Sequence, residues 1–195
     1  SERMAEILEP YNYSPVNEPD QADLIILNTC HIREKAAEKI YSELGRLKKI
    51  NNKSNREPKI AVAGCVGQAE GQEIINRSPI VDLVFGPLTY HQLPEMLESI
   101  ETKKGFPNKK LVNIEVPDID KFNQLKGSRK SLRSISSLLS VQEGCDKFCS
   151  FCVVPYTRGV EISRPANQIL KEAVELVENG AKEIILLGQN VNAWL

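Results

Sequence analysis

The chain has 195 residues and a formal net charge of −1, with 41% hydrophobic and 26% charged residues. These values are ordinary for a globular protein and allow one large domain or two small ones. No stretch is apolar over the length needed to span a membrane, and no signal segment opens the sequence, so we expect a cytoplasmic protein with reduced cysteines.

The amino-terminal part predicts a helix, a strand and a second helix. Residues 2–9 place apolar side chains among charged ones in a helical pattern. The continuous apolar run Leu24–Leu27 is typical of a strand buried on both faces. From His31 to Leu47, apolar residues recur every three or four positions, which predicts a helix with one buried stripe. Cys30 is therefore expected where this strand ends and this helix begins.

The same alternation then repeats. Residues 59–63 predict a second strand with Cys65 just beyond its end, and residues 68–77 predict the next helix. Residues 80–85 predict a third strand. One further helix is expected, and its apolar stripe is Leu93, Met96, Leu97 and Ile100. Alternating strands and helices imply right-handed crossovers and a three-layer α/β domain with a parallel sheet, which we place at residues 1–102.

Cys30 and Cys65 are expected to lie at one edge of this sheet. Ligand sites in such sheets lie beyond the carboxyl ends of the strands, and both cysteines follow a strand directly. We therefore expect them close enough to share a metal cluster. Taken alone, the two residues fit buried thiols that pack as small hydrophobic side chains better than they fit ligands.

The composition becomes basic between Lys103 and Arg133, where nine Lys or Arg stand against three Asp or Glu. Several Gly and Pro residues in the same stretch indicate a connection between two domains at residues 103–135, with a short strand at Leu111–Val116. A solvated linker and a surface that contacts phosphate both fit this charge.

Residues 136–195 predict a second domain that contains one βαβ unit. A strand at Leu138–Gln142 is followed by a helix that Pro165 opens, and Glu183–Leu187 is the next strand. The apolar stripe expected on the helix is Ile169, Ala173, Leu176 and Val177.

Three cysteines lie in the loop after the first of these strands. Cys145, Cys149 and Cys152 have the spacing Cys-x3-Cys-x2-Cys, which matches three corners of a [4Fe-4S] cluster and leaves one iron open to a small molecule. A structural zinc site needs four ligands, and no fourth is near. The ferredoxin spacing differs, and an odd total of five cysteines makes a disulfide a poor explanation. Zinc and inert thiols remain the alternatives.

This loop resembles that of the radical S-adenosylmethionine (SAM) enzymes, in which the position before the last cysteine is aromatic, as Phe151 is here. Three further strings, Asn28–Cys30, Val153–Gly159 and Gly188–Trp194, are similar to those of the bacterial tRNA methylthiotransferases that modify isopentenyladenosine. The resemblance covers essentially the whole chain. It implies that the second domain is the start of a (β/α) barrel.

The resemblance also implies the cofactors, which are two [4Fe-4S] clusters and SAM. Cys145, Cys149 and Cys152 would hold the cluster that binds SAM, with Phe151 at the cofactor. Cys30 and Cys65 would be two ligands of an auxiliary cluster, whose third cysteine would lie in a leader before Ser1. Arg158 and Arg164 are candidates for contact with RNA or SAM, although each could equally be an ordinary ion-pairing residue.

The implied reaction is the radical transfer of a methylthio group to carbon 2 of isopentenyladenosine beside the anticodon. The implied partners are tRNA and an external electron donor, and we expect a monomer. Because the chain resembles a protein truncated at both ends, we expect no activity from these residues alone. The alternatives are action on threonylcarbamoyladenosine tRNA or on a ribosomal protein, and a non-catalytic module that carries a cluster or binds RNA.

Overall fold

The computed structural model describes residues 2–31, 34–54, 57–100, 110–116 and 135–194. The chain divides into two compact units, residues 1–117 and 118–195, and each is described by itself. Most of the connection predicted at 103–135 lies outside the described residues. Within the described part of the chain, no helix combines the length and the apolar character needed to cross a membrane.

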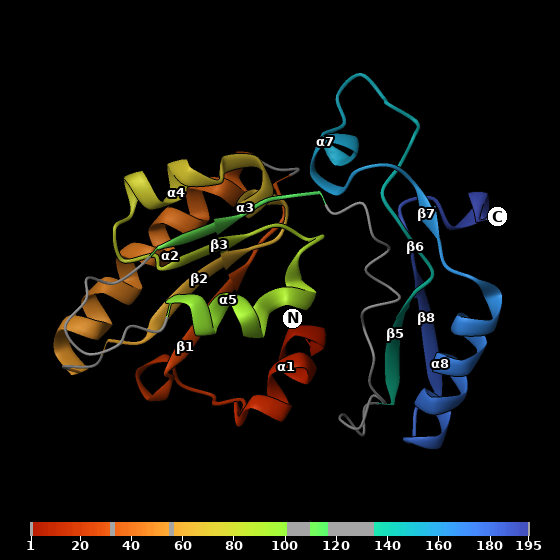
Figure 1. Cartoon of the computed structure of the whole chain (residues 1–195), viewed down its shortest axis with the longest axis horizontal. Coiled ribbons are helices and arrows are strands. Elements are labelled where there is room, and N and C mark those ends of the chain that lie inside the picture. Colours follow the sequence, from red (N-terminus) through yellow and green to blue (C-terminus); the bar gives the residue numbers. More distant parts are fainter. Residues whose placement is uncertain (1, 32–33, 55–56, 101–109, 117–134, 195) are drawn as a thin grey trace. The chain divides into compact units, whose positions relative to one another are not determined.

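The first unit is built on a parallel sheet of four strands in the order β1-β2-β3-β4 (Figure 1). The strands are β1 (Leu24–Asn28), β2 (Lys59–Ala63), β3 (Leu83–Phe85) and β4 (Leu111–Asn113). The parallel sheet expected from the sequence is therefore confirmed. The short strand expected inside the connection is β4, and it belongs to the sheet of this unit.

Helices cover both faces of this sheet, as the alternating side chains of the strands require. Ala61 and Ala63 of β2 pack on one face with helices α1 and α5, whereas Ile60 and Val62 pack on the other with α2, α3 and α4. The helices are α1 (Glu2–Leu8), α2 (Glu34–Ser54), α3 (Cys65–Glu70), α4 (Gln72–Arg77) and α5 (Leu93–Ile100). Short 3-10 helices lie at Glu9–Tyr11, Pro19–Gln21 and Tyr90–Gln92. The three-layer α/β prediction is confirmed.

Three elements of this unit differ from the expectation. The single helix predicted at 68–77 is two helices, because the backbone of Gly71 has φ +47° and interrupts the helical path. The first of them already begins at Cys65. The third strand is shorter than predicted, since Pro79 and Ile80 form a turn. Strand β1 is only half-buried, because it lies at the edge of the sheet.

The second unit contains the expected βαβ arrangement. Strands β5 (Ser136–Ser140) and β8 (Glu183–Leu187) are parallel neighbours, and α8 (Ala166–Glu178) lies between them in sequence. The strand predicted at 138–142 therefore starts earlier and ends at Ser140. No closed barrel is formed within the described residues, where this sheet has two strands.

A small antiparallel ribbon follows β5 and holds the cysteine loop. It pairs β6 (Gln142–Glu143) with β7 (Ile162–Ser163), and α7 (Val154–Arg158) lies in the loop between them (Figure 1). A 3-10 helix at Val191–Ala193 follows β8. On α8, the predicted stripe is confirmed for Ile169, Ala173 and Leu176, which pack in the core, but it is wrong for Val177, which is 57% exposed.

Candidate functional site

The cysteine loop is closed at its base by a close approach of two backbone segments. Gly144 has φ +71°, and a Cβ atom placed on it would lie 1.8 Å from the carbonyl oxygen of Val160. The N–H of Cys145 donates to the carbonyl of Gly159 at 3.2 Å, and the N–H of Glu161 donates to Oδ1 of Asp146 at 3.0 Å. Only glycine fits both the backbone angle and the space at position 144. The ribbon therefore presents residues 145–161 as one closed loop.

Aromatic side chains lie on the outside of this loop. Phe148 has φ +45° and meets the ring of Tyr156 edge to face, with the ring centres 6.4 Å apart. Phe151, the residue expected at the cofactor, is 92% exposed. Large exposed apolar rings on a short loop are unusual for an isolated surface and are found where a ligand or another chain segment covers them.

The three loop cysteines are all accessible to solvent. Cys145 and Cys152 are half-buried and Cys149 is exposed. The N–H of Cys152 donates a hydrogen bond to the carbonyl of Cys149 at 2.9 Å. All five cysteines of the chain are described, and none forms a disulfide. Across the described residues, however, no three His, Cys, Asp or Glu side chains converge as a set of metal ligands. The donor atoms suit a cluster.

The two arginines named from the sequence have different surroundings. Arg158 is the last residue of α7 and is half-buried. Arg164 is buried, where its Nη1 donates to the carbonyl of Ser140 at 2.7 Å and its Nη2 lies 2.7 Å from Oε2 of Glu172. The ion-pairing alternative therefore describes the guanidinium of Arg164. Contact of either residue with RNA or SAM stays a prediction.

Gln142 was not identified as a site residue from the sequence. It is 2% exposed, its Oε1 accepts a hydrogen bond from the N–H of Asn190 at 3.2 Å, and its Nε2 has no hydrogen-bond partner among the described residues. Trp194 Nε1 donates to the carbonyl of Arg164 at 3.0 Å. The string at 188–194 therefore contacts the chain just after β7. A polar residue at the end of an apolar predicted strand, just before the cysteine motif, was the available signal for Gln142.

The first unit holds the other two cysteines at one edge of its sheet. Asn28 and Ala63 are register partners at the carboxyl ends of β1 and β2, and the N–H of Thr29 donates to the carbonyl of Ala63 at 3.1 Å. Cys30 and Cys65 each follow within two residues. Their predicted placement at the same sheet edge is therefore confirmed, whereas their sharing of a cluster stays a prediction.

The two thiols differ in exposure. Cys30 is exposed, and Cys65 is 3% exposed at the first position of α3. Gly64 between β2 and α3 has φ +88°, and a Cβ atom on it would lie 2.7 Å from the carbonyl oxygen of Thr29. The strand ends therefore approach closely at this point. The buried-thiol alternative suits the surroundings of Cys65 but not those of Cys30.

Two family models match separate parts of the chain. Residues 1–86 match the family described as "Uncharacterized protein family UPF0004", and residues 139–195 match the Radical SAM superfamily. The first match covers β1 to β3 with Cys30 and Cys65, and the second covers the cysteine ribbon and the βαβ unit apart from the first three residues of β5.

Curated relatives match the chain from end to end. It is 58% identical over 194 residues to a protein of Ruegeria sp. (strain TM1040) and 58% identical to one of Ruegeria pomeroyi, each covering 100% of this chain and 43% of the relative. A protein of Jannaschia sp. (strain CCS1) is 56% identical, with 40% of the relative covered. All three are named tRNA-2-methylthio-N(6)-dimethylallyladenosine synthase. The chain spans less than half the length of these relatives.

Proposed function

We propose that this chain is part of a tRNA methylthiotransferase, because residues 1–86 match the UPF0004 family and residues 139–195 match the Radical SAM superfamily. The observation that carries the proposal is the loop of Cys145, Cys149 and Cys152, presented by the ribbon of β6 and β7. Identity of 55–58% to relatives named for this activity supports it across the whole chain.

The proposed first cofactor is a [4Fe-4S] cluster held by these three thiolates. The donor set fits, because thiolates are the usual ligands of such clusters and three of them lie within eight residues of accessible loop. The sulfur atoms would have to converge on binding, since no three-ligand set is formed in this structure among its described residues. The cluster and SAM would together supply the radical chemistry.

The residues of the chain would position these groups. Gly144 and the hydrogen bond from Cys145 to Gly159 hold the base of the loop, so that only residues 146–152 need to move when a cluster binds. The exposed Phe151 would cover the cofactor from the solvent side. Gln142 would orient the segment that follows β8, because its Oε1 accepts a hydrogen bond from the N–H of Asn190.

Cys30 and Cys65 are the proposed ligands of a second, auxiliary cluster. Their place at the carboxyl edge of a parallel sheet supports this, because ligands bind there in α/β folds. The loop of Cys145, Cys149 and Cys152 provides three thiolates, whereas Cys30 and Cys65 provide two. The proposal therefore includes a further ligand from the same protein.

The proposed substrate is isopentenyladenosine in tRNA, methylthiolated at carbon 2. The names of the relatives support this choice over threonylcarbamoyladenosine or a ribosomal protein. We further propose an external electron donor, a monomeric state and a cytoplasmic location, which suit an enzyme that acts on tRNA.

The experiment uses the full-length protein, reconstituted with iron and sulfide without oxygen. With SAM and a strong reductant it should release deoxyadenosine, and Cys149→Ala should abolish this release. The Cys30→Ala variant should still cleave SAM but should fail to methylthiolate tRNA. Deoxyadenosine from Cys149→Ala at the wild-type rate would refute the assignment of the loop.

A non-catalytic carrier of one cluster is the second candidate, favoured by the solvent-accessible position of Cys145, Cys149 and Cys152. A carrier would be reduced and reoxidised without consuming SAM. Nucleoside analysis of tRNA from a deletion strain separates the candidates, since loss of methylthio-isopentenyladenosine is expected only for the enzyme.

A further inference from the structure

Lysines gather at the end of α2 that is farther from Cys30. The helix starts four residues after Cys30 and has 21 residues, so it is about 30 Å long. It connects the parallel strands β1 and β2, and therefore runs from the carboxyl edge of the sheet to the amino edge (Figure 1). Its last two turns carry Lys48, Lys49 and Lys53, all exposed, and no acidic residue. Within the described part of the chain, these three lysines form no ion pair.

This charge pattern differs from that of an ordinary exposed helix face. Cations in the last turn of a helix interact favourably with the helix dipole, but only Lys53 lies in that turn. Earlier in the same helix, charges of both signs are mixed, and Arg46 pairs with Glu43. The dipole and the usual mixture of surface charges therefore leave Lys48 and Lys49 unexplained.

A polar hollow of about 550 Å³ lies beside this end of α2, at the amino ends of β2 and β3. Lys110 adds a cation at its wall, because its Nζ donates to the carbonyl of Pro79, which lines the hollow. The charged and amide side chains in the lining are those of Lys48, Asn51, Asn52, Glu57, Lys59 and Asp82.

One of the two acidic side chains in the hollow is already compensated. Oδ2 of Asp82 accepts a hydrogen bond from the N–H of Ile60 at 2.9 Å, and Oδ1 lies 3.6 Å from Nζ of Lys59. Asp82 and Lys59 therefore balance each other within the sheet. The other charges in and beside the hollow are four lysines and one carboxylate, which are Lys48, Lys49, Lys53, Lys110 and Glu57. We call the hollow with these four lysines the lysine hollow; it is cationic in a chain whose net charge is −1.

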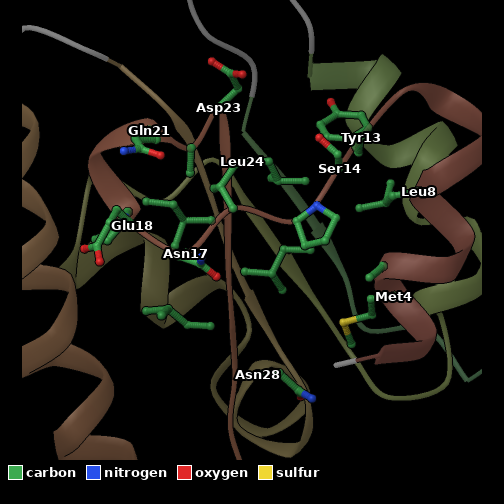
Figure 2. A pocket seen from close by; sticks show the side chains of 18 of the residues that line it. Met4, Leu8, Tyr13, Ser14, Asn17, Glu18, Gln21, Asp23, Leu24 and Asn28 are labelled. Atoms are coloured by element: carbon green, nitrogen blue, oxygen red, sulfur yellow. The ribbon is translucent and has the colours of Figure 1, made fainter. Parts of the chain in front are cut away.

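A cavity of about 750 Å³ beside β1 has a different character. Its lining includes apolar side chains such as Leu8, and the charged side chains that Figure 2 labels, Glu18 and Asp23, are both acidic. Arg46 also lines this cavity, but its charge is paired with that of Glu43. An anionic ligand therefore fits the lysine hollow and not the cavity beside β1.

We propose that the lysine hollow holds the sugar-phosphate backbone of the tRNA substrate. The inference rests on the proposed function and adds the surface that takes the RNA. Lysines bind phosphates by releasing counterions, and the exposed amide of Asn52 suits the hydroxyl of a ribose. From Lys48 to Lys53 the charges extend about 7.5 Å along the helix, which favours a ligand with phosphates in a row over a single phosphate. Backbone contacts position a nucleic acid without reading its bases, so the hollow contributes affinity and the cysteine sites carry the chemistry.

Binding of tRNA to the full-length, reconstituted protein tests the proposal. The double variant Lys48→Ala/Lys49→Ala removes two phosphate contacts at exposed positions, so the fold is kept. At about 0.15 M salt its Kd for tRNA should rise roughly tenfold, and the slope of log Kd against log salt concentration should fall by about 1.5. Iron content, SAM cleavage without tRNA, and kcat at saturating tRNA should match the wild type. Lys48→Arg/Lys49→Arg keeps both charges and should keep the wild-type Kd.

The matched control removes two exposed lysines of the second unit, in Lys171→Ala/Lys182→Ala. It changes the net charge by the same amount. Its Kd for tRNA should change by less than about threefold, since exposed charges are largely screened beyond about 10 Å. Equal effects of the two double variants would show a general effect of charge and would overturn the proposal.

The remaining outcomes separate this inference from the proposed function. If Lys48→Ala/Lys49→Ala binds and methylthiolates tRNA like the wild type, the lysine hollow does not hold RNA, while the proposed function stands. If the variant keeps its affinity for tRNA but is reduced more slowly by an acidic redox protein, the lysines bind a protein partner and the proposal is overturned. A wild-type protein that fails to bind tRNA would refute the proposed function and this inference with it.

Discussion

At the scale of single residues, the guanidinium of Arg164 joins the end of β5 to α8. It bonds the carbonyl of Ser140 and the carboxylate of Glu172, and both side chains of this ion pair are about 10% exposed. A buried pair adds little over a hydrophobic pair, but removing one member leaves an unpaired buried charge. The sequence singled out Arg164 as a candidate site residue but did not identify its ion-pair partner. Glu172 is eight residues away, and its sequence context predicts a solvent-exposed position on the helix.

We therefore expect Glu172→Ala to lower the free energy of unfolding by about 3–5 kcal/mol, because the buried charge of Arg164 then lacks its ion-pair partner. Glu178→Ala, an exposed change on the same helix, should stay within about 0.5 kcal/mol. Urea unfolding monitored by circular dichroism gives both values. If both changes lowered the free energy of unfolding equally, the ion pair of Arg164 and Glu172 would not contribute to stability as proposed.

Tyr41 predicts a pH dependence of the first unit. Burial, followed by the hydrogen bond that its hydroxyl donates to Glu70, raises the pKa of Tyr41 from 10.0 to about 12. Because the folded-state pKa lies above the unfolded value, this contribution to stability is fully present below pH 10 and is lost as the pH rises toward 12.

Urea midpoints measured from pH 9 upward should therefore fall more steeply in the wild type than in Tyr41→Phe. The exposed Tyr11→Phe is the control and should follow the wild type. The interpretation fails if Tyr41→Phe keeps the full alkaline decline.

Gly144 at the base of the cysteine loop and Gly180 after α8 allow backbone strain to be measured separately from steric collision. Both have positive φ, but a Cβ on Gly144 would collide with Val160, whereas Gly180 has no atom within 4 Å of that position. Gly180→Ala should cost about 1–2 kcal/mol through backbone strain alone. Gly144→Ala should cost more and should abolish cluster binding in reconstituted protein, as measured by iron content and visible absorption. Normal iron content in Gly144→Ala would refute a fixed loop base.

At the scale of elements, periodicity located the buried faces well where a helix is covered along its length. All four predicted stripe residues of α5 are buried, because the sheet covers that face completely. On α8 the same pattern wrongly predicted that Val177 is buried. Within the described residues the sheet of β5 and β8 has only two strands, so it covers a narrower face of this helix. The break at Gly71 was equally invisible, because a glycine inside a helical pattern does not reveal its φ angle.

Neighbouring residues of α8 test this narrow face. Leu176 is 5% exposed and packs against Leu139, Val141 and Ala181, so Leu176→Ala should cost about 2–4 kcal/mol. Val177→Ala should cost under about 1 kcal/mol. Thermal or urea unfolding of the two variants compares them, and a larger loss for Val177→Ala would contradict the packing of this helix.

At the scale of the whole molecule, the two cysteine sites belong to different compact units. Their residues could be named from the sequence, because cysteine spacing and strand ends are local features. The geometry of the two sites could not be predicted from the sequence, because the convergence of the thiols depends on the loop conformation and on the ligand itself. The predicted connection at 103–135 stays a prediction for those of its residues that the structure does not describe.

Separate units predict separate cluster binding. In the 195-residue chain, reconstitution should load the loop of Cys145, Cys149 and Cys152, and Cys65→Ala should not change the iron bound there. Cys149→Ala should remove that iron. Electron paramagnetic resonance of the reduced protein distinguishes the outcomes, and loss of the loop signal in Cys65→Ala would show that the units depend on each other.

The pairing of β4 with β3 fixes when the first sheet becomes complete on the ribosome. The first sheet receives its last strand at Asn113, so it can close only after that residue has left the exit tunnel. The loop of Cys145, Cys149 and Cys152 emerges after a further 39 residues, 114 to 152, which takes roughly 2–8 s at about 5–20 residues per second. During that interval the edge with Cys30 and Cys65 is present and the loop is not. Iron delivery to a nascent chain would therefore meet the two sites in sequence.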